Sequence, residues 1–245
     1  MLICGLAVKR ADARAIHEDL LVRSESGRGG WIVTLNLEML SRGVRDPAYR
    51  ALLSQADECI ADGMPLVWAS RLGRHSGSGG IAGRTTGVDL VERILGAAEI
   101  PPFVIIGGHH PRKALARFEG ASEACRYLYD GGVDLSDRQV DEFATEIRRC
   151  RPRLVFLALG VPKQDQLALK LRALAPEPVY IGVGGTFEML APGGKRAPLW
   201  MRKSGLEWFY RLVSDPGRLW KRYLLSYPVG AWRLLKDTYL KPETS

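Results

Sequence analysis

Short, continuous apolar runs alternate with longer segments of helical pattern through most of the chain. The runs predict buried strands at Trp31–Asn36, Phe103–Gly107, Leu154–Gly160 and Val179–Val183. Helices are predicted from Asp46-Pro47 to about Asp57, from Ser136 to about Cys150, and from Pro162 through Leu174. Each begins with a residue that favours a helix start, because Asp and Ser cap helix N-termini and proline fits the first turn.

This alternation indicates an α/β fold with a mostly parallel sheet. Strands that are apolar along their whole length are buried on both faces, so helices must cover both sides of the sheet. We therefore expect a Rossmann-like architecture in which ligands bind beyond the carboxyl ends of the strands. The residues that directly follow each strand are the first candidates for a functional site.

The pattern changes after Pro198, where runs of strand type stop. Short helical segments are predicted at roughly Lys203–Val213, Pro216–Ser226 and Val229–Leu240, broken at Asp215-Pro216 and at Pro228. We accordingly divide the chain into an α/β core, residues 1–198, and a C-terminal helical appendage, residues 199–245.

Positive charge and aromatic residues gather in the C-terminal part of the chain. The 245 residues carry a formal net charge of +8, and the segment from Lys195 to Ser245 holds eleven Lys or Arg against four Asp or Glu. The same segment contains four of the six Trp and four of the eight Tyr. Basic side chains mixed with amphipathic aromatics suit an anionic, partly apolar surface such as a lipid headgroup layer.

Other features of the sequence indicate the compartment. The four cysteines are far apart and form no C-x-x-C pair, as is usual for thiols in a reducing environment. Lys9 and Arg10 follow the N-terminal apolar run, which is the reverse of a signal peptide. No apolar stretch approaches the ~18 residues of a membrane-spanning helix. We expect a cytoplasmic protein whose membrane contact is peripheral, on the inner face.

Polar or glycine-rich segments at strand ends and turns supply candidate site residues. Asp62 lies in a turn that we expect to follow a helix, where it can act as a general base or simply bind its own backbone. Gly160–Gln164 follows a strand and opens a helix, so Lys163 and free N–H groups can hold an anion, although a plain strand-to-helix turn explains the same residues. Gly184 and Gly185 allow close backbone approach to a ligand or tight packing.

Two further patterns carry weaker signals. Gly77–Ala82 fits G-x-G-x-x-A, but no strand leads into it, so it is a poor dinucleotide fingerprint. The adjacent His109 and His110 lack further ligands at helical spacing, which favours a surface loop, and no metal site is predicted.

Three arginines of the predicted appendage have a helical spacing. Arg211, Arg218 and Arg222 fall at i, i+7 and i+11, on one face if the helix were continuous. The Asp215-Pro216 break argues against that continuity, so a solvated basic face stays open as the alternative.

Eight sequence blocks follow one another in a fixed order along the chain. They are Thr34-Leu-Asn36, Ala61-Asp-Gly-Met-Pro65, Arg84-Thr-Thr-Gly87 with Asp89, Gly107-Gly108, Gly160-Val-Pro-Lys-Gln164, Gly182-Val-Gly-Gly185, Lys195-Arg-Ala-Pro198, and Gly205-Leu-Glu-Trp-Phe-Tyr-Arg211 followed by Pro216, Arg218 and Trp220-Lys-Arg-Tyr223. No single block is decisive, but their order is. In these blocks the chain resembles the bacterial WecG/TagA/CpsF glycosyltransferase family nearly from end to end.

The resemblance implies an activity and its partners. Enzymes of this family move a sugar from a UDP-sugar to a polyprenyl-diphosphate-linked sugar at the cytoplasmic membrane face, for teichoic acids, capsules and exopolysaccharides. They invert the anomeric centre and are regarded as metal-independent. The implied partners are therefore a UDP-sugar donor, the lipid-linked acceptor and the inner membrane surface, with no cofactor.

Residue roles carry over from the matching motifs. Asp62 corresponds to the family's proposed general base. By the same resemblance and the glycine and arginine patterns above, the expected substrate-binding residues are Thr34, Asn36, Arg84, Lys163, Gln164, Gly184, Gly185, Arg196, Arg211, Arg218 and Arg222. The appendage is thought to close over the site and bring arginines to the diphosphate.

The chain departs from the family pattern at several positions. Asp165 stands where glutamate is usual, Glu188 where aspartate is usual, Pro192 where glycine is usual, and Leu37 where proline is common. Asp165 and Glu188 keep a carboxylate, but each differs from the usual residue of the family by one methylene group. We interpret these changes as tuning of the donor or acceptor preference. No catalytic role is assigned to Glu188.

Two other classes of protein fit parts of the sequence. A nicotinamide-dependent oxidoreductase needs G-x-G-x-x-G in its first βα turn, which this chain lacks. A nucleic-acid-binding protein fits the net charge, but the charge lies in an aromatic-rich tail without a recognised module, so no nucleic acid is expected. The sequence names neither donor sugar nor acceptor, and a homo-oligomer stays open.

Overall fold

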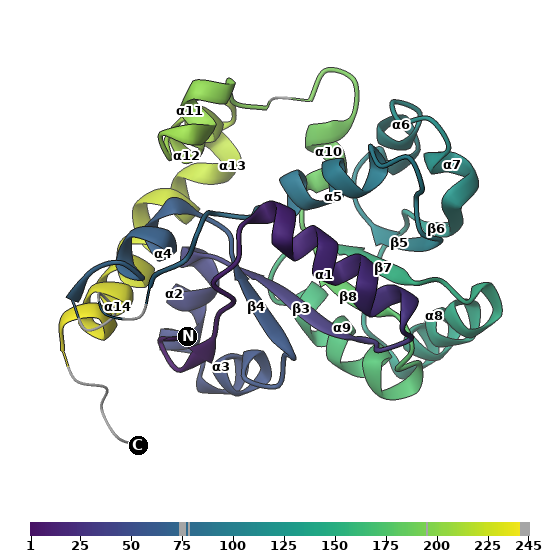
Figure 1. Cartoon of the computed structure of the whole chain (residues 1–245), viewed down its shortest axis with the longest axis horizontal. Coiled ribbons are helices and arrows are strands. Elements are labelled where there is room, and N and C mark those ends of the chain that lie inside the picture. The colour runs from purple at the N-terminus through teal and green to yellow at the C-terminus, as the bar shows by residue number, and fades with distance from the viewer. Residues whose placement is uncertain (74–76, 78, 195, 241–245) are drawn as a thin grey trace.

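Six parallel strands form the central sheet of the computed structural model (Figure 1). The structure describes residues 1–240 apart from 74–76, 78 and 195. The strands are β3 (Gly30–Leu35), β4 (Glu58–Ala61), β5 (Phe103–Gly107), β6 (Cys125–Tyr129), β7 (Leu154–Ala158) and β8 (Val179–Gly182), in the spatial order β4-β3-β8-β7-β5-β6. The predicted α/β class with a parallel sheet is confirmed.

Alternate residues of each strand supply two hydrophobic clusters, one on each face of the sheet. In β3, Trp31, Val33 and Leu35 belong to one cluster and Ile32 to the other, because successive side chains of a strand point to opposite faces. This explains why the strands are apolar without interruption.

Helices cover both faces, as the sequence predicts. One face carries α2 (Leu37–Arg45), α3 (Pro47–Leu53), α4 (Met64–Ala69), α8 (Asp137–Cys150), α9 (Lys163–Leu174) and α14 (Tyr227–Tyr239). The other carries α1 (Ala13–Glu25), α5 (Gly87–Leu95), α6 (Pro111–Leu115), α7 (Ala121–Ala124) and α10 (Thr186–Leu190). A small antiparallel hairpin, β1 (Leu2–Ile3) with β2 (Leu6–Ala7), packs on the first face.

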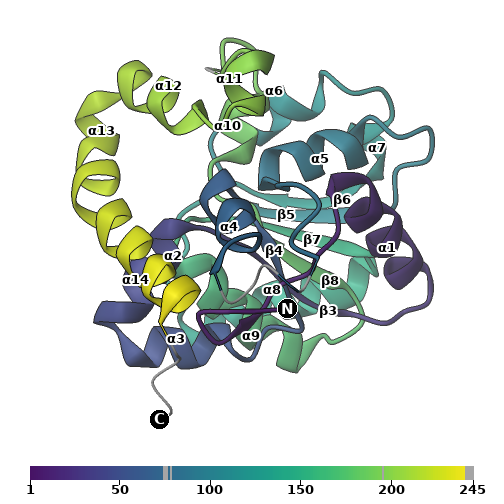
Figure 2. The ribbon, with the colours of Figure 1, turned by 60° about the vertical axis from the view of Figure 1, so that its left-hand side comes forward.

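The C-terminal part forms an arch of helices at one side of the sheet (Figure 2). It consists of α11 (Leu199–Lys203), α12 (Glu207–Ser214), α13 (Pro216–Lys221), a π-helical segment (Arg222–Ser226) and α14. The break at Asp215-Pro216 is confirmed, but the break at Pro228 is wrong. Tyr227 N–H bonds to Arg222 O, five residues back, and this wider turn lets the helix pass Pro228, which has no N–H to donate.

The last helix packs directly against the core. Leu234 of α14 is buried in the larger cluster, and a Cβ at Gly230 would lie only 2.1 Å from Leu37 O of α2. The two helices therefore touch backbone to backbone. The division at residues 198 and 199 stays a prediction.

Within the described residues, no helix combines the length and the apolar composition needed to cross a membrane.

Candidate active site

Two adjacent strands create the crevice in which the candidate site lies. β3 and β8 are neighbours. The chain leaves β3 into α2, whose Met39 and Leu40 pack on one face, and leaves β8 into α10, whose Phe187 and Leu190 pack on the other. Connections that diverge in this way open a crevice at the carboxyl ends of the strands.

A polar cavity of about 250 Å³ occupies this crevice. Thr34 Oγ1 donates to Gly182 O at 2.9 Å, and Gln164 Oε1 accepts from Gly184 N–H at 3.1 Å. Gly182 leaves room for the buried Gln164, since a Cβ there would lie 2.5 Å from Gln164 Nε2. Gly160, Gly184 and several other glycines line the wall, so a ligand can approach the backbone closely.

Asp62 follows β4 directly. The predicted helix before it ends at Leu53 and a strand intervenes, so that part of the expectation is wrong. Asp62 N–H donates to Leu35 O at 2.8 Å, and Thr85 N–H donates to Ala61 O at 2.8 Å. These bonds hold Asp62 at the end of β4, between the end of β3 and the segment that precedes α5.

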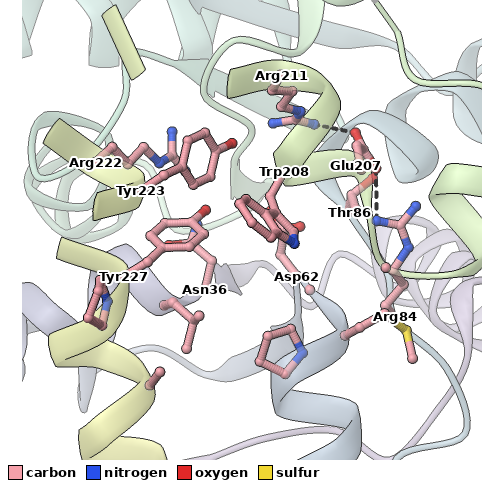
Figure 3. Close-up of a pocket in the computed structure, with 17 residues that line it drawn as sticks. Asn36, Asp62, Arg84, Thr86, Glu207, Trp208, Arg211, Arg222, Tyr223 and Tyr227 are labelled. Atoms are coloured by element: carbon pink, nitrogen blue, oxygen red, sulfur yellow. Dashed lines mark hydrogen bonds and ion pairs between the residues drawn. The ribbon is translucent and has the colours of Figure 1, made fainter. Parts of the chain in front are cut away.

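A second, mainly apolar cavity of about 340 Å³ also has Asp62 in its wall (Figure 3). Its walls include Met64 and Pro65 from α4 and an aromatic set from the C-terminal arch, Trp208, Tyr223 and Tyr227. Trp208 and Tyr223 rings are 5.9 Å apart, and Tyr223 and Tyr227 rings 4.6 Å apart. The residues that line both cavities are Asn36, Asp62, Thr86, Arg211 and Arg222.

The surroundings of Asp62 make it a stronger base than an exposed aspartate. Burial raises the pKa of Asp62 to about 6, Glu207 also raises this pKa, and Arg211, Arg84 and Arg222 lower it. The carboxyl group is therefore ionised at neutral pH, yet its pKa is close to the pH at which it would accept a proton.

Glu207 joins two arginines at the rim of the apolar cavity. Its Oε2 accepts from Arg84 Nη1 at 2.8 Å and its Oε1 from Arg211 Nη2 at 2.5 Å, shown as dashed lines in Figure 3. Burial alone would raise the pKa of Glu207, but Arg211 and Arg84 hold that pKa below its usual value. Glu207 is thus a buried carboxylate at neutral pH.

Arg222 reaches the same region from the π-helical segment. Arg222 Nε lies 2.8 Å from Glu38 Oε2, and the guanidinium stands over the rings of Tyr223 and Tyr227 at 5.9 and 5.7 Å. Glu38 is fixed in the first turn of α2, where Asn36 Oδ1 caps its N–H at 3.0 Å. Arg211 and Arg222 both line the polar cavity, although Asp215 separates their helices.

A wider cavity of about 750 Å³ continues from the polar cavity beneath α12 and α13. Gly185, Arg211 and Arg222 line both of them, and Glu188 lines the wider one. The two spaces therefore form one continuous region of ligand size beside Asp62.

Most of the predicted site residues meet at these cavities. They are Thr34, Asn36, Asp62, Arg84, Gln164, Gly184, Gly185, Arg211 and Arg222. Lys163 Nζ instead donates to Val133 O at 2.8 Å, and Arg196 pairs with Asp89 and Glu92 of α5. The Arg218 side chain lies outside the described part of the structure. The substrate roles of all these residues stay predictions.

Sequence reasoning missed several residues that line the site. They are Glu38, Thr86, Glu207, Trp208, Tyr223 and Tyr227. A sequence signal existed for Glu207, which stands four residues before Arg211 and so faces it on a helix. Trp208 and Tyr223 stand in the sequence blocks that resemble the family, whereas Tyr227 had no signal beyond the abundance of aromatic residues in the tail.

Within the residues that the structure describes, no group of three or more His, Cys, Asp or Glu side chains is arranged to hold a metal ion.

Comparison with known proteins adds the family. The sequence profile described as "Glycosyl transferase WecG/TagA/CpsF family" matches residues 1–244. The chain belongs to this family. It is a glycosyltransferase, and the match decides for this class over the oxidoreductase and the nucleic-acid-binding protein that fit parts of its sequence.

Curated relatives within this family carry a more specific name. An N-acetylglucosaminyldiphosphoundecaprenol N-acetyl-beta-D-mannosaminyltransferase of Bacillus subtilis (strain 168) is 34% identical over 224 residues, covering 88% of this glycosyltransferase and 85% of the relative. A protein of the same name from Staphylococcus aureus (strain MW2) is 29% identical over 227 residues, 87% and 82% of the two chains.

Proposed function

We propose that this WecG/TagA/CpsF glycosyltransferase moves an N-acetylmannosamine-type sugar from a UDP-sugar to a polyprenyl-diphosphate-linked saccharide during synthesis of a cell-surface polymer. The reaction inverts the anomeric centre, needs no metal ion, and uses Asp62 as general base. One observation carries the proposal: Asp62 stands where a polar, glycine-lined cavity meets an apolar one. The names of the relatives support the choice of sugar and acceptor.

The donor nucleotide sugar occupies the polar cavity and its continuation beneath the arch. Glycine walls allow its diphosphate to lie against the backbone, and Arg211 and Arg222 supply positive charge on the same side. Guanidinium groups in a water-poor cavity offset the charge that develops on a leaving diphosphate. These arginines take the place of a metal ion in the proposal, and full activity in EDTA is the expected result.

The acceptor enters through the apolar cavity. Trp208, Tyr223 and Tyr227 form an aromatic wall that suits both a sugar ring and the first isoprene units of a polyprenyl chain. An acceptor saccharide placed there presents a hydroxyl group to Asp62, with the donor sugar on the far side.

Inversion is the stereochemical course that this proposed arrangement implies. The acceptor oxygen attacks the anomeric carbon from the face opposite to the UDP leaving group, so the configuration inverts. Asp62 takes the hydroxyl proton as the new C–O bond forms and the bond to UDP breaks. A base with a pKa of about 6 is mostly ionised at neutral pH and still strong enough to accept that proton.

The C-terminal arch is the proposed contact with the inner membrane surface. It exposes many large apolar side chains, namely Leu199, Trp200, Val213, Leu224, Leu225, Trp232, Leu235 and Tyr239. Lys221 and Lys236 stand beside Trp220 and Trp232, so basic and aromatic groups share this surface. Such a surface binds anionic bilayers, and the binding weakens as salt rises.

Asp62→Asn tests the role of the base. The variant keeps the shape of the site, so calorimetry should show UDP-sugar affinity within about threefold of wild type while transfer falls by about a hundredfold or more. Near-normal turnover by Asp62→Asn would refute the assignment. Asp141→Asn, on the exposed face of α8, is the matched control and should transfer normally.

A further inference from the structure

We propose that Glu207 is a positioning residue that couples docking of α12 onto the core to the placement of Arg211 beside Asp62. The docking half of this inference rests on the fold alone, and the catalytic half rests on the proposed function. Neither the family description nor the names of the relatives assigns a role to this residue.

The geometry of one carboxylate carries the proposal. Glu207 is the first residue of α12 and is only 7% exposed. Its two oxygens are divided between two partners, with Arg84 of the core on Oε2 and Arg211 of its own helix on Oε1. A single side chain therefore ties a core segment to the appendage arginine that lines both cavities.

Arg84 is itself held in place by the core. It precedes Thr85, whose N–H bonds to Ala61 O next to Asp62, and its guanidinium also lies 3.9 Å from Asp89 Oδ2 of α5. The anchor for Glu207 is thus built into the same backbone that fixes the proposed base. Movement of α12 away from the core would separate Arg211 from Asp62 and Glu207 from Arg84 together.

Removal of the Glu207 charge has a specific electrostatic consequence. Two partly buried arginines would then face each other without the buried carboxylate between them, and breaking an ion pair of this kind by removing one partner is unfavourable. We expect α12 to leave its docked position for a substantial fraction of the time. Arg211 would go with it, because both residues lie on one helix.

The Glu207 charge also reaches Asp62. Charged and titratable groups lie around Asp62 on several elements: Glu38 of α2, Arg84 before α5, Glu207 and Arg211 from α12, Arg222 and Tyr223 from the π-helical segment, and Tyr227 from α14. Of the two acids, Glu38 is paired with Arg222, and the charge of Glu207 raises the pKa of Asp62. A purely scaffolding residue would not shift the pH dependence of transfer, whereas Glu207 should, because it raises the pKa of Asp62.

Glu207→Gln and Glu207→Asp test the proposal together, with exposed Glu123→Gln of α7 as the control. For Glu207→Gln we expect faster hydrogen exchange across α12 in the enzyme without substrates. We also expect kcat to fall by about ten- to a hundredfold, since a displacement of ~1 Å costs that much. Turnover comes from the docked fraction, in which Arg211 still faces Asp62 and only the Glu207 charge is missing, so the acidic limb of the kcat profile should move to lower pH. Glu207→Asp keeps the charge and should recover the acidic limb and part of kcat.

A double-mutant cycle between Arg84 and Glu207 gives a second test. If Glu207 acts through Arg84, the double variant Arg84→Gln with Glu207→Gln loses little more kcat than the worse single variant. Full additivity, or a Glu207→Gln enzyme with wild-type exchange in α12 and an unchanged acidic limb, would overturn the proposal. Absence of transfer in the wild-type enzyme would instead contradict the proposed function, and the exchange measurement would still decide the docking half.

Discussion

Replacement of Asp62 by asparagine should stabilise the fold while it abolishes transfer. Burial raises the pKa of Asp62 from 3.8 to about 6, and each pKa unit corresponds to about 1.4 kcal/mol. The ionised carboxylate therefore costs the folded protein about 3 kcal/mol relative to the unfolded chain. Asparagine has nearly the same shape and carries no charge, so the variant avoids this cost.

The raised pKa of Asp62 determines how the stability difference depends on pH. Because the pKa is higher in the folded state, the folded protein binds the extra proton and loses stability as pH rises from about 4 to about 6. Below this window Asp62 is protonated in both states and costs nothing. The advantage of Asp62→Asn should therefore be about 1 kcal/mol at pH 4.5 and about 3 kcal/mol at pH 8.

Urea unfolding of both proteins at these two pH values measures the difference. The exposed Asp141→Asn variant should stay within about 0.5 kcal/mol of wild type at both. Two results would refute the account of this carboxylate as a charge held in a poorly solvated site. One is an Asp62→Asn variant that is less stable than wild type at pH 8. The other is a variant that exceeds the stability of wild type by the same amount at both pH values.

Three further variants test other parts of the structure. Gly182→Ala places a Cβ 2.5 Å from Gln164 Nε2 and should displace that amide, which weakens UDP-sugar binding at least about fivefold in calorimetry. Gly230→Ala meets the backbone oxygen of Leu37 at 2.1 Å and should lower stability by about 1–3 kcal/mol in urea unfolding. A double Leu224→Ser and Leu225→Ser variant removes two exposed apolar side chains and should reduce sedimentation with anionic vesicles while circular dichroism stays unchanged. Wild-type behaviour in any of these assays counts against the contact concerned.

The sheet could be predicted because its strands are buried on both faces. Runs such as Phe103–Gly107 and Leu154–Ala158 are apolar throughout, and only the centre of a covered sheet accommodates them. β4 escaped prediction because only Cys59, Ile60 and Ala61 follow the polar Glu58, too short a run to distinguish from the end of a helix. Because this strand was missed, the sequence analysis wrongly placed Asp62 directly after a helix.

The sequence could predict those residues of the candidate site that lie at the end of a strand. Thr34, Asn36 and Gly184 lie at the carboxyl ends of β3 and β8, and the parallel sheet brings these ends together. Lys163 shows the limit of the argument, since a long side chain at the same edge can turn to a nearby carbonyl, here Val133 O.

The C-terminal arch could be predicted only in part. Its charge and aromatic content are visible in the sequence, and the Asp215 break is correct. The meeting of Arg211 and Arg222 depends on the angle between α12 and the following helix, which spacing does not encode. The helix through Pro228 depends on a π turn, a feature without a composition signature.

The most direct test of the central claim is the transfer reaction itself. The purified protein is incubated in EDTA with UDP-N-acetylmannosamine and a short-chain polyprenyl-diphosphate-N-acetylglucosamine, alongside other UDP-sugars, and the lipid product is analysed by mass and by anomeric coupling in NMR. The account predicts a product heavier by one N-acetylhexosamine residue, with inverted configuration, that is missing with Asp62→Asn. Release of free sugar without a lipid product, a retained configuration, or a strict need for metal would contradict it.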